Sequence, residues 1–110
     1  MSSSLGSYVV VLITVPDFDT GVKIGRELVF SRLVACVNIV REVKSIFLWE
    51  GKVDEASEAL LIVKTRLDKM DEVIRKVKEL HPYQVPEIIA LPIVYGLESY
   101  LKWIDEVVQH

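Results

Sequence analysis

Three short segments of this sequence carry apolar side chains on both faces of a β-strand, and this pattern restricts the possible folds more than any other feature. Residues 8–15, 58–66 and 87–94 are rich in β-branched and other apolar residues and are too short for typical helices. Leu61 and Ile62, adjacent in the second segment, show that neither of its faces is polar. An antiparallel sheet with one face in water alternates apolar and polar residues. A sheet built from these strands therefore needs a cover on both faces.

Two helices are predicted between these strands. Residues 20–34 carry apolar residues at roughly helical spacing, and several polar residues from Asp17 onward offer N-caps. Residues 69–81 have a clearer apolar face, with Asp68 as the expected N-cap and Pro82 as the stop. Each helix would carry the chain from one strand to the next.

A long hairpin and a C-terminal helix complete the pattern. Residues 36–50 alternate over a greater length than an ordinary strand, and the polar cluster that begins at Arg41 predicts a bulge or bend within it. Gly51 then turns the chain into the strand at 58–66. Apolar residues at helical spacing over 100–108 predict the terminal helix.

The predicted order of elements is βαββαβ followed by a helix, which is the plan of an α+β, ferredoxin-like sandwich. Right-handed crossovers place the strands in the order 4-1-3-2, with the two main helices on one face. We expect residues 1–7 to form a flexible tail and residues 8–110 to form one domain. Because one terminal helix is too short to cover the other face, we expect a homo-oligomer in which open faces pack together and hairpin edges pair between chains.

Composition and charge exclude several classes of protein. Hydrophobic residues make up 51% of the chain, which excludes a disordered protein. The net charge is −3, from 13 basic and 16 acidic residues, and the basic residues form no stripe, so we expect no nucleic-acid partner. The apolar run at 8–15 is far too short to span a membrane, so we expect no membrane association. Cys36 is the only cysteine, which excludes an intrachain disulfide and favours a cytoplasmic location.

One rim of the predicted sheet gathers the most conspicuous polar residues. The ends of the first strand and of the second helix, the hairpin turn and the start of the last strand meet there. The residues that could converge are His81, Tyr83, Glu87, Trp49, Glu50 and Thr14. An imidazole with two carboxylates is a possible metal site, although the spacing matches no zinc motif. The simpler alternative is that His81 only ends a helix, where a histidine complements the helix dipole.

The opposite rim carries Cys36 and Lys64, which are expected to lie too far from His81 to share a metal within one chain. Cys36 is either a small buried hydrophobe or a ligand completed by a neighbouring chain. Lys64 either packs its stem with its ammonium in water or binds an anion in a cleft between subunits. Trp49 and Trp103 are expected to pack or to lie at an interface. Common catalytic signatures are absent, so we do not expect an enzyme.

Five segments together closely resemble the CutA divalent-cation tolerance family. They are residues 32–39, 45–52, 64–65, 81–88 and 100–104, in the family's order and spacing. The resemblance implies a ferredoxin-like homotrimer built through long hairpins and shaped like the PII signalling proteins. It also implies binding of divalent cations, copper-like or zinc-like, and a contribution to heavy-metal tolerance. Similar animal proteins have been linked to assembly of membrane-anchored acetylcholinesterase, so the fold constrains function loosely.

Three departures from the family bear on metal binding. Ile13 and Leu80 stand where some bacterial relatives have a cysteine and a second histidine, and Phe47 stands where relatives often have tyrosine. The resemblance leaves these candidate ligands, with His81 the best: His81, Glu87, Glu50 and Cys36.

Three functions are therefore expected in order of preference. The first is a trimer that binds divalent cations and contributes to metal tolerance. The second is a PII-like regulatory trimer whose intersubunit clefts bind a small anionic ligand. The residues expected in those clefts are Lys64, Trp49, Tyr83 and Trp103. The third is an assembly scaffold without a ligand.

Overall fold

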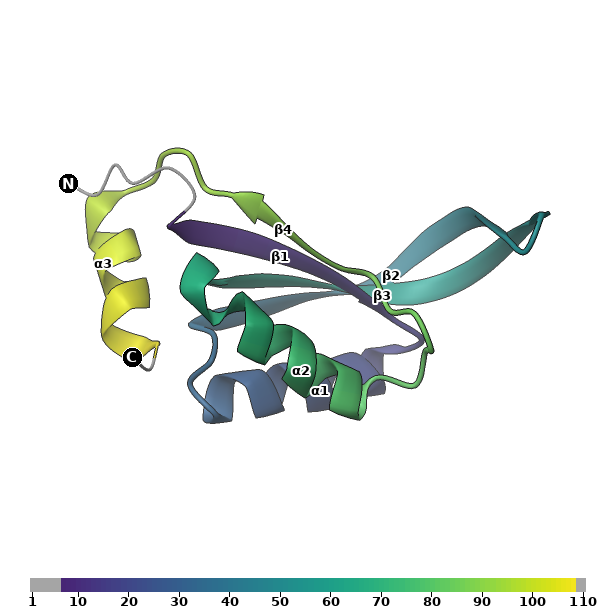
Figure 1. Ribbon diagram of the computed structural model, residues 1–110, viewed down its shortest axis with the longest axis horizontal. Helices are drawn as coiled ribbons and strands as arrows, with labels where there is room; N and C mark the ends of the chain where they lie inside the picture. The colour runs from purple at the N-terminus through teal and green to yellow at the C-terminus, as the bar shows by residue number, and fades with distance from the viewer. Residues whose placement is uncertain (1–6, 109–110) are drawn as a thin grey trace.

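A four-stranded antiparallel sheet organises the fold. A computed structural model describes residues 7–108, so residues 1–6 of the predicted tail and the last two residues of the predicted domain lie outside the described residues. The strands pair in the order β2-β3-β1-β4 (Figure 1), which confirms the predicted ferredoxin-like order. The elements are β1 (Tyr8–Val15), α1 (Phe18–Phe30), β2 (Cys36–Trp49), β3 (Lys52–Arg66), a 3₁₀ turn η1 (Leu67–Lys69), α2 (Met70–Leu80), β4 (Ile88–Pro92) and α3 (Glu98–Val107).

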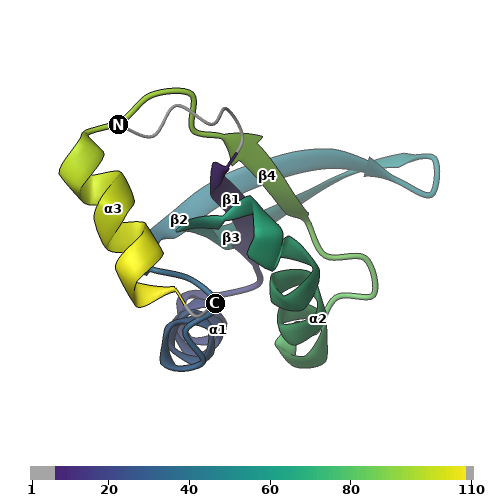
Figure 2. The same ribbon diagram turned by 60° about the vertical axis from the view of Figure 1, so that its left-hand side comes forward.

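Helices α1 and α2 lie side by side on one face of the sheet (Figures 1 and 2). The core lies between them and the sheet, and its side chains are buried. They include Val11, Ile13, Leu61 and Val63 from the strands and Ile24, Leu28, Val73 and Val77 from the helices. Full burial of each such side chain contributes roughly 1.5–3 kcal/mol. We call this side of the sheet the covered face.

Two glycines let α1 approach the sheet closely. A Cβ on Gly25 would lie 3.2 Å from Cγ1 of Val37, and a Cβ on Gly21 would lie 3.1 Å from Cδ2 of Leu61. Glycine lowers helix propensity, yet here its missing side chain provides the space that the packing requires.

The first helix begins and ends earlier than the predicted 20–34. It begins at Phe18 because the side chain of Asp17 accepts a hydrogen bond from the backbone N–H of Thr20, at 2.7 Å. Helix α1 ends at Phe30, and Arg32 has a φ of 62°, which is outside the helical region.

The predicted cap of the second helix is wrong. A 3₁₀ turn precedes α2, and the N-cap residue of α2 is Lys69, whose side chain makes no capping hydrogen bond. Asp68 instead pairs with Arg66 at 2.7 Å. The carboxylate that was predicted to cap α2 therefore forms an ion pair instead.

The hairpin is longer on its second side than predicted. Strand β3 begins at Lys52 rather than at residue 58, because the turn consists of only Glu50 and Gly51. Both turn residues have positive φ, 52° and 82°, as a tight two-residue hairpin requires. The register shift between Val40 and Val43 confirms the predicted bend. The outer part of the hairpin projects beyond the sheet (Figure 1).

The other side of the sheet, which we call the open face, is apolar and only partly covered. Leu12 is paired with Ile62 on one side and with Ile89 on the other, so the three side chains form a row on this face. Ile89 is 49% exposed. Helix α3 packs only on one end of this region, against Tyr8 and Ala35. The cover that the sequence demanded is therefore incomplete in one chain.

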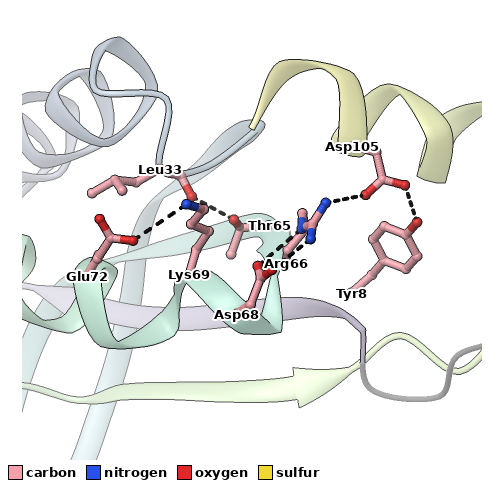
Figure 3. A network of polar contacts seen from close by, with 8 residues as sticks. All are labelled: Tyr8, Leu33, Thr65, Arg66, Asp68, Lys69, Glu72 and Asp105. Carbon is pink, nitrogen blue, oxygen red and sulfur yellow. Dashed lines mark hydrogen bonds and ion pairs between the residues drawn. The ribbon is translucent and has the colours of Figure 1, made fainter. Parts of the chain in front are cut away.

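A polar network holds α3 at that end (Figure 3). The hydroxyl of Tyr8 donates to Asp105 at 2.5 Å, and Arg66 donates to the same carboxylate at 2.9 Å. Arg66 thus joins Asp105 of α3 to Asp68 of η1.

Candidate functional site

His81 ends α2, and both of its ring nitrogens form hydrogen bonds. Nε2 lies 2.7 Å from the carbonyl oxygen of Thr14, and the backbone N–H of Tyr83 donates to Nδ1 at 3.1 Å. Nδ1 therefore accepts and Nε2 carries the proton that it donates to Thr14, which is the neutral imidazole. The residue is only 7% exposed. Its contacts fix the connection after α2 onto the end of β1.

Tyr83 and Glu58 form the second polar contact at this rim. The hydroxyl of Tyr83 donates to Oε2 of Glu58 at 2.7 Å. Partial burial, helped by the bond to Glu58, raises the pKa of Tyr83 to about 12. Glu58 is only 8% exposed. Sequence reasoning missed Glu58, whose only signal was an acid next to the apolar run of β3.

A cleft of about 840 Å³ lies between the projecting hairpin and the connection that follows α2. The lining residues used below are Thr14, Phe47, Trp49, Glu58, Tyr83 and Glu87. The predicted convergence is thus found for Thr14, Trp49, Tyr83 and Glu87. His81 and Glu50 are not among the residues that line it; Glu50 is exposed in the hairpin turn.

Cys36 and Lys64 lie at the other end of the sheet, as expected. They face each other across β2 and β3, and the ammonium of Lys64 donates to Oδ1 of Asn38. The sulfur of Cys36 lies 3.8 Å from the same oxygen. Partial burial, with a smaller contribution from Cys36, raises the pKa of Tyr100.

The four residues predicted for an intersubunit cleft therefore divide into two groups. Trp49 and Tyr83 line the cleft beside the hairpin. Trp103 packs against Tyr100 with the two rings tilted and their centroids 5.4 Å apart, near the end that carries Lys64. Only neighbouring copies could bring Lys64 to the rim aromatics.

Residues 7–108 of one chain do not provide a complete transition-metal site. Within residues 7–108, no three His, Cys, Asp or Glu side chains are grouped so that they could hold an ion. Structural zinc sites use four ligands, and His81 already uses both of its nitrogens. Ile13 and Leu80 pack in the core of the covered face. The donors among the described residues of one chain are therefore too few for a complete site.

Comparison with known proteins identifies the relatives of this chain. The family model described as CutA1 divalent ion tolerance protein matches residues 9–107. The divalent-cation tolerance protein CutA of Thermus thermophilus is 50% identical over 97 residues, which are 88% of this chain and 94% of that protein. The chloroplastic protein CutA of Arabidopsis thaliana is 45% identical over 103 residues, which are 94% of this chain. The matched region spans only 57% of the length of the Arabidopsis protein.

A solved structure supports the same relationship. The periplasmic divalent cation tolerance protein CutA from Archaeoglobus fulgidus superposes with a TM-score of 0.90 at 44% identity. The match covers 93% of this chain and 99% of that chain. The fold agreement therefore extends over nearly the whole length of both.

These relatives correct the predicted location. One is described as periplasmic and another as chloroplastic, so the predicted cytoplasmic location was wrong. That prediction rested on the single cysteine. A lone cysteine excludes an intrachain disulfide but does not distinguish compartments. Across residues 7–108, no helix combines the length and apolar character needed to cross a membrane.

Proposed function

The chain belongs to the CutA1 divalent ion tolerance family, and from that premise we propose that it is a homotrimer that binds divalent cations and contributes to heavy-metal tolerance. The family match over residues 9–107 carries this proposal. The family descriptions name tolerance of cations and no catalytic activity.

The surfaces of one chain support assembly. Besides the apolar row on the open face, the hairpin carries exposed apolar side chains, among them Leu48, which is 72% exposed. Strand β2 is an edge of the sheet, so its outer backbone groups can pair with another chain. If open faces pack together and hairpin edges pair between chains, the apolar faces and the unpaired backbone groups are both removed from water. A closed ring of three copies satisfies these demands with one repeated contact.

The incomplete donor set supports cation sites shared between chains. Glu87 lines the cleft, Glu50 lies in the hairpin turn, and Cys36 lies at the far end of the same strand pair. His81 belongs to the donor set only if it exchanges one of its two hydrogen bonds for the ion. Imidazole and thiolate donors suit copper and zinc better than carboxylates alone.

Titration calorimetry with Cu²⁺ and Zn²⁺ tests the proposal. We expect saturable heats for the wild-type protein under conditions where sedimentation finds a trimer. Replacement of a true donor, tested with Cys36→Ser, Glu87→Gln and His81→Ala, weakens affinity at least about tenfold. Glu27→Gln, an exposed acid on α1, is the matched control. Absence of heat with both ions, or a monomer with undiminished binding, contradicts the proposal.

The cleft favours a second candidate, a regulatory trimer that binds a small ligand. Its volume suits an organic molecule. Two acids line it and Lys64 lies at the other end of the sheet, so an anionic ligand is not favoured. Thermal-shift screening distinguishes the candidates, because a ligand that binds only the folded protein raises its apparent stability. The scaffold alternative requires no shift with metals or metabolites.

A further inference from the structure

Within residues 7–108, Glu58 is a buried acid without a cationic partner. The only hydrogen bond that its carboxylate makes to the described residues comes from the hydroxyl of Tyr83. Lys44, the lysine on the cleft lining, pairs with Glu55 at 3.2 Å. A carboxylate removed from water is costly unless it is paired as well as hydrogen-bonded.

Tyr83 satisfies one oxygen of Glu58 but does not supply a positive charge. The raised pKa of Tyr83 keeps its hydroxyl protonated at neutral pH, so the hydroxyl remains a donor. The carboxyl group of Glu58 lies at the wall of the cleft. Glu87, also on the lining, adds a second acidic group.

The rest of the lining suits an organic cation. Phe47, Trp49 and Tyr83 present aromatic rings to the cleft, and ring faces attract ammonium and guanidinium groups. The volume of about 840 Å³ is in the range of small-molecule sites and far exceeds the space that a bare ion occupies. The acidic donors are oxygens, whereas copper and zinc prefer nitrogen and sulfur ligands.

We propose that this cleft binds a primary ammonium or guanidinium group on an apolar stem, with Glu58 as its charge partner and the aromatic rings around the stem. The site shares Glu87 with the donors proposed for divalent cations, but binding of the organic cation requires no metal ion. The cation comes either from a free amine or from a lysine or arginine side chain of a second copy of this chain. Both sources present the same chemistry to Glu58.

Calorimetry with 1,4-diaminobutane and with spermidine tests the free-amine source, using the full chain in the presence of EDTA. Glu58→Gln keeps an acceptor for Tyr83 and removes the charge, so we expect at least tenfold weaker binding. Glu27→Gln, at an exposed acid on α1 away from the cleft lining, is the control and leaves binding unchanged. The neutral analogue 1,4-butanediol is expected not to bind. Circular dichroism verifies that each variant folds, and Glu87→Gln provides a second variant at an exposed position.

Sedimentation velocity on the same variants tests the second source. If no amine binds but Glu58→Gln dissociates the oligomer and Glu27→Gln does not, the cation belongs to a neighbouring copy and the proposal stands. The proposal is overturned if butanediol binds as well as the diamine. It is also overturned if amines do not bind and Glu58→Gln leaves the oligomer intact. Because EDTA removes divalent cations, none of these outcomes decides whether the protein binds metals.

Discussion

Leu61 and Ile62 are neighbours on β3, and their side chains leave the strand on opposite faces of the sheet. Leu61 is 0% exposed beneath the helices, whereas Ile62 lies in the partly covered row with Leu12 and Ile89. The two faces contain the same kinds of residue. What distinguishes them is the cover that one chain supplies, so apolar composition alone does not separate the core of a fold from a surface used for assembly.

The largest effect on stability is expected from shortening a buried side chain on the covered face. Leu61→Ala removes a fully buried side chain and leaves a cavity, so the free energy of unfolding should fall by about 2–5 kcal/mol. Chemical denaturation measures the loss, with Ile62→Ala as the neighbouring control. A loss below about 1 kcal/mol for Leu61→Ala would contradict the conclusion that the covered face forms the core.

A smaller effect on folding, with a clear effect on assembly, is expected from the open face. Ile89→Glu places a charge in the apolar row, so the proposed trimer should dissociate at a protein concentration at least about tenfold higher, with helix content unchanged. Sedimentation velocity measures the change. Phe30→Glu, at an exposed apolar residue on α1, should leave assembly intact. Equal dissociation by both variants would break the distinction between the faces.

The smallest effect concerns the cleft, where Thr14 of the open face and the connection after α2 meet. The pKa of Tyr83 is raised from 10.0 to about 12 in the folded chain, so its stabilising contribution is fully present below pH 10. That contribution is lost as the pH rises through 12. Tyr83→Phe should therefore cost about 1 kcal/mol at pH 8 and show a shallower loss of stability between pH 10 and 12.

Urea denaturation of both proteins at pH 8, 10 and 12 measures this difference. The other tyrosines titrate in both proteins and cancel in the comparison. Parallel losses of stability across this range would show that the contact between Tyr83 and Glu58 does not contribute.

The sequence predicted the sheet because its information was local and periodic. Strand composition, turn residues and the polar interruption at Arg41 gave the order of elements and the bend, both confirmed in the structure. The rule for helix caps failed where a neighbouring cation competes for the same carboxylate. Asp68 was predicted to cap α2, but Arg66, brought alongside by the end of β3, pairs with it instead.

The candidate site was predictable only as a neighbourhood. Topology correctly brought Tyr83, Glu87 and Trp49 to one rim. It did not show that the carbonyl of Thr14, 67 positions away, would engage Nε2 of His81. Nor did it show that Tyr83 would turn toward Glu58, because that depends on the conformation of an irregular connection. Directions of side chains in such connections follow from packing rather than from spacing.

The contact between Tyr8 and Asp105 has a further consequence for the chain as a polymer. The two residues are 97 positions apart, and their hydrogen bond ties the first strand to the last helix. Arg66 donates to the same carboxylate. Fraying at the beginning of β1 and detachment of α3 therefore both require breaking hydrogen bonds to Asp105. The two extremities of the fold are thereby expected to open together, as a single cooperative unit rather than as independent loose ends.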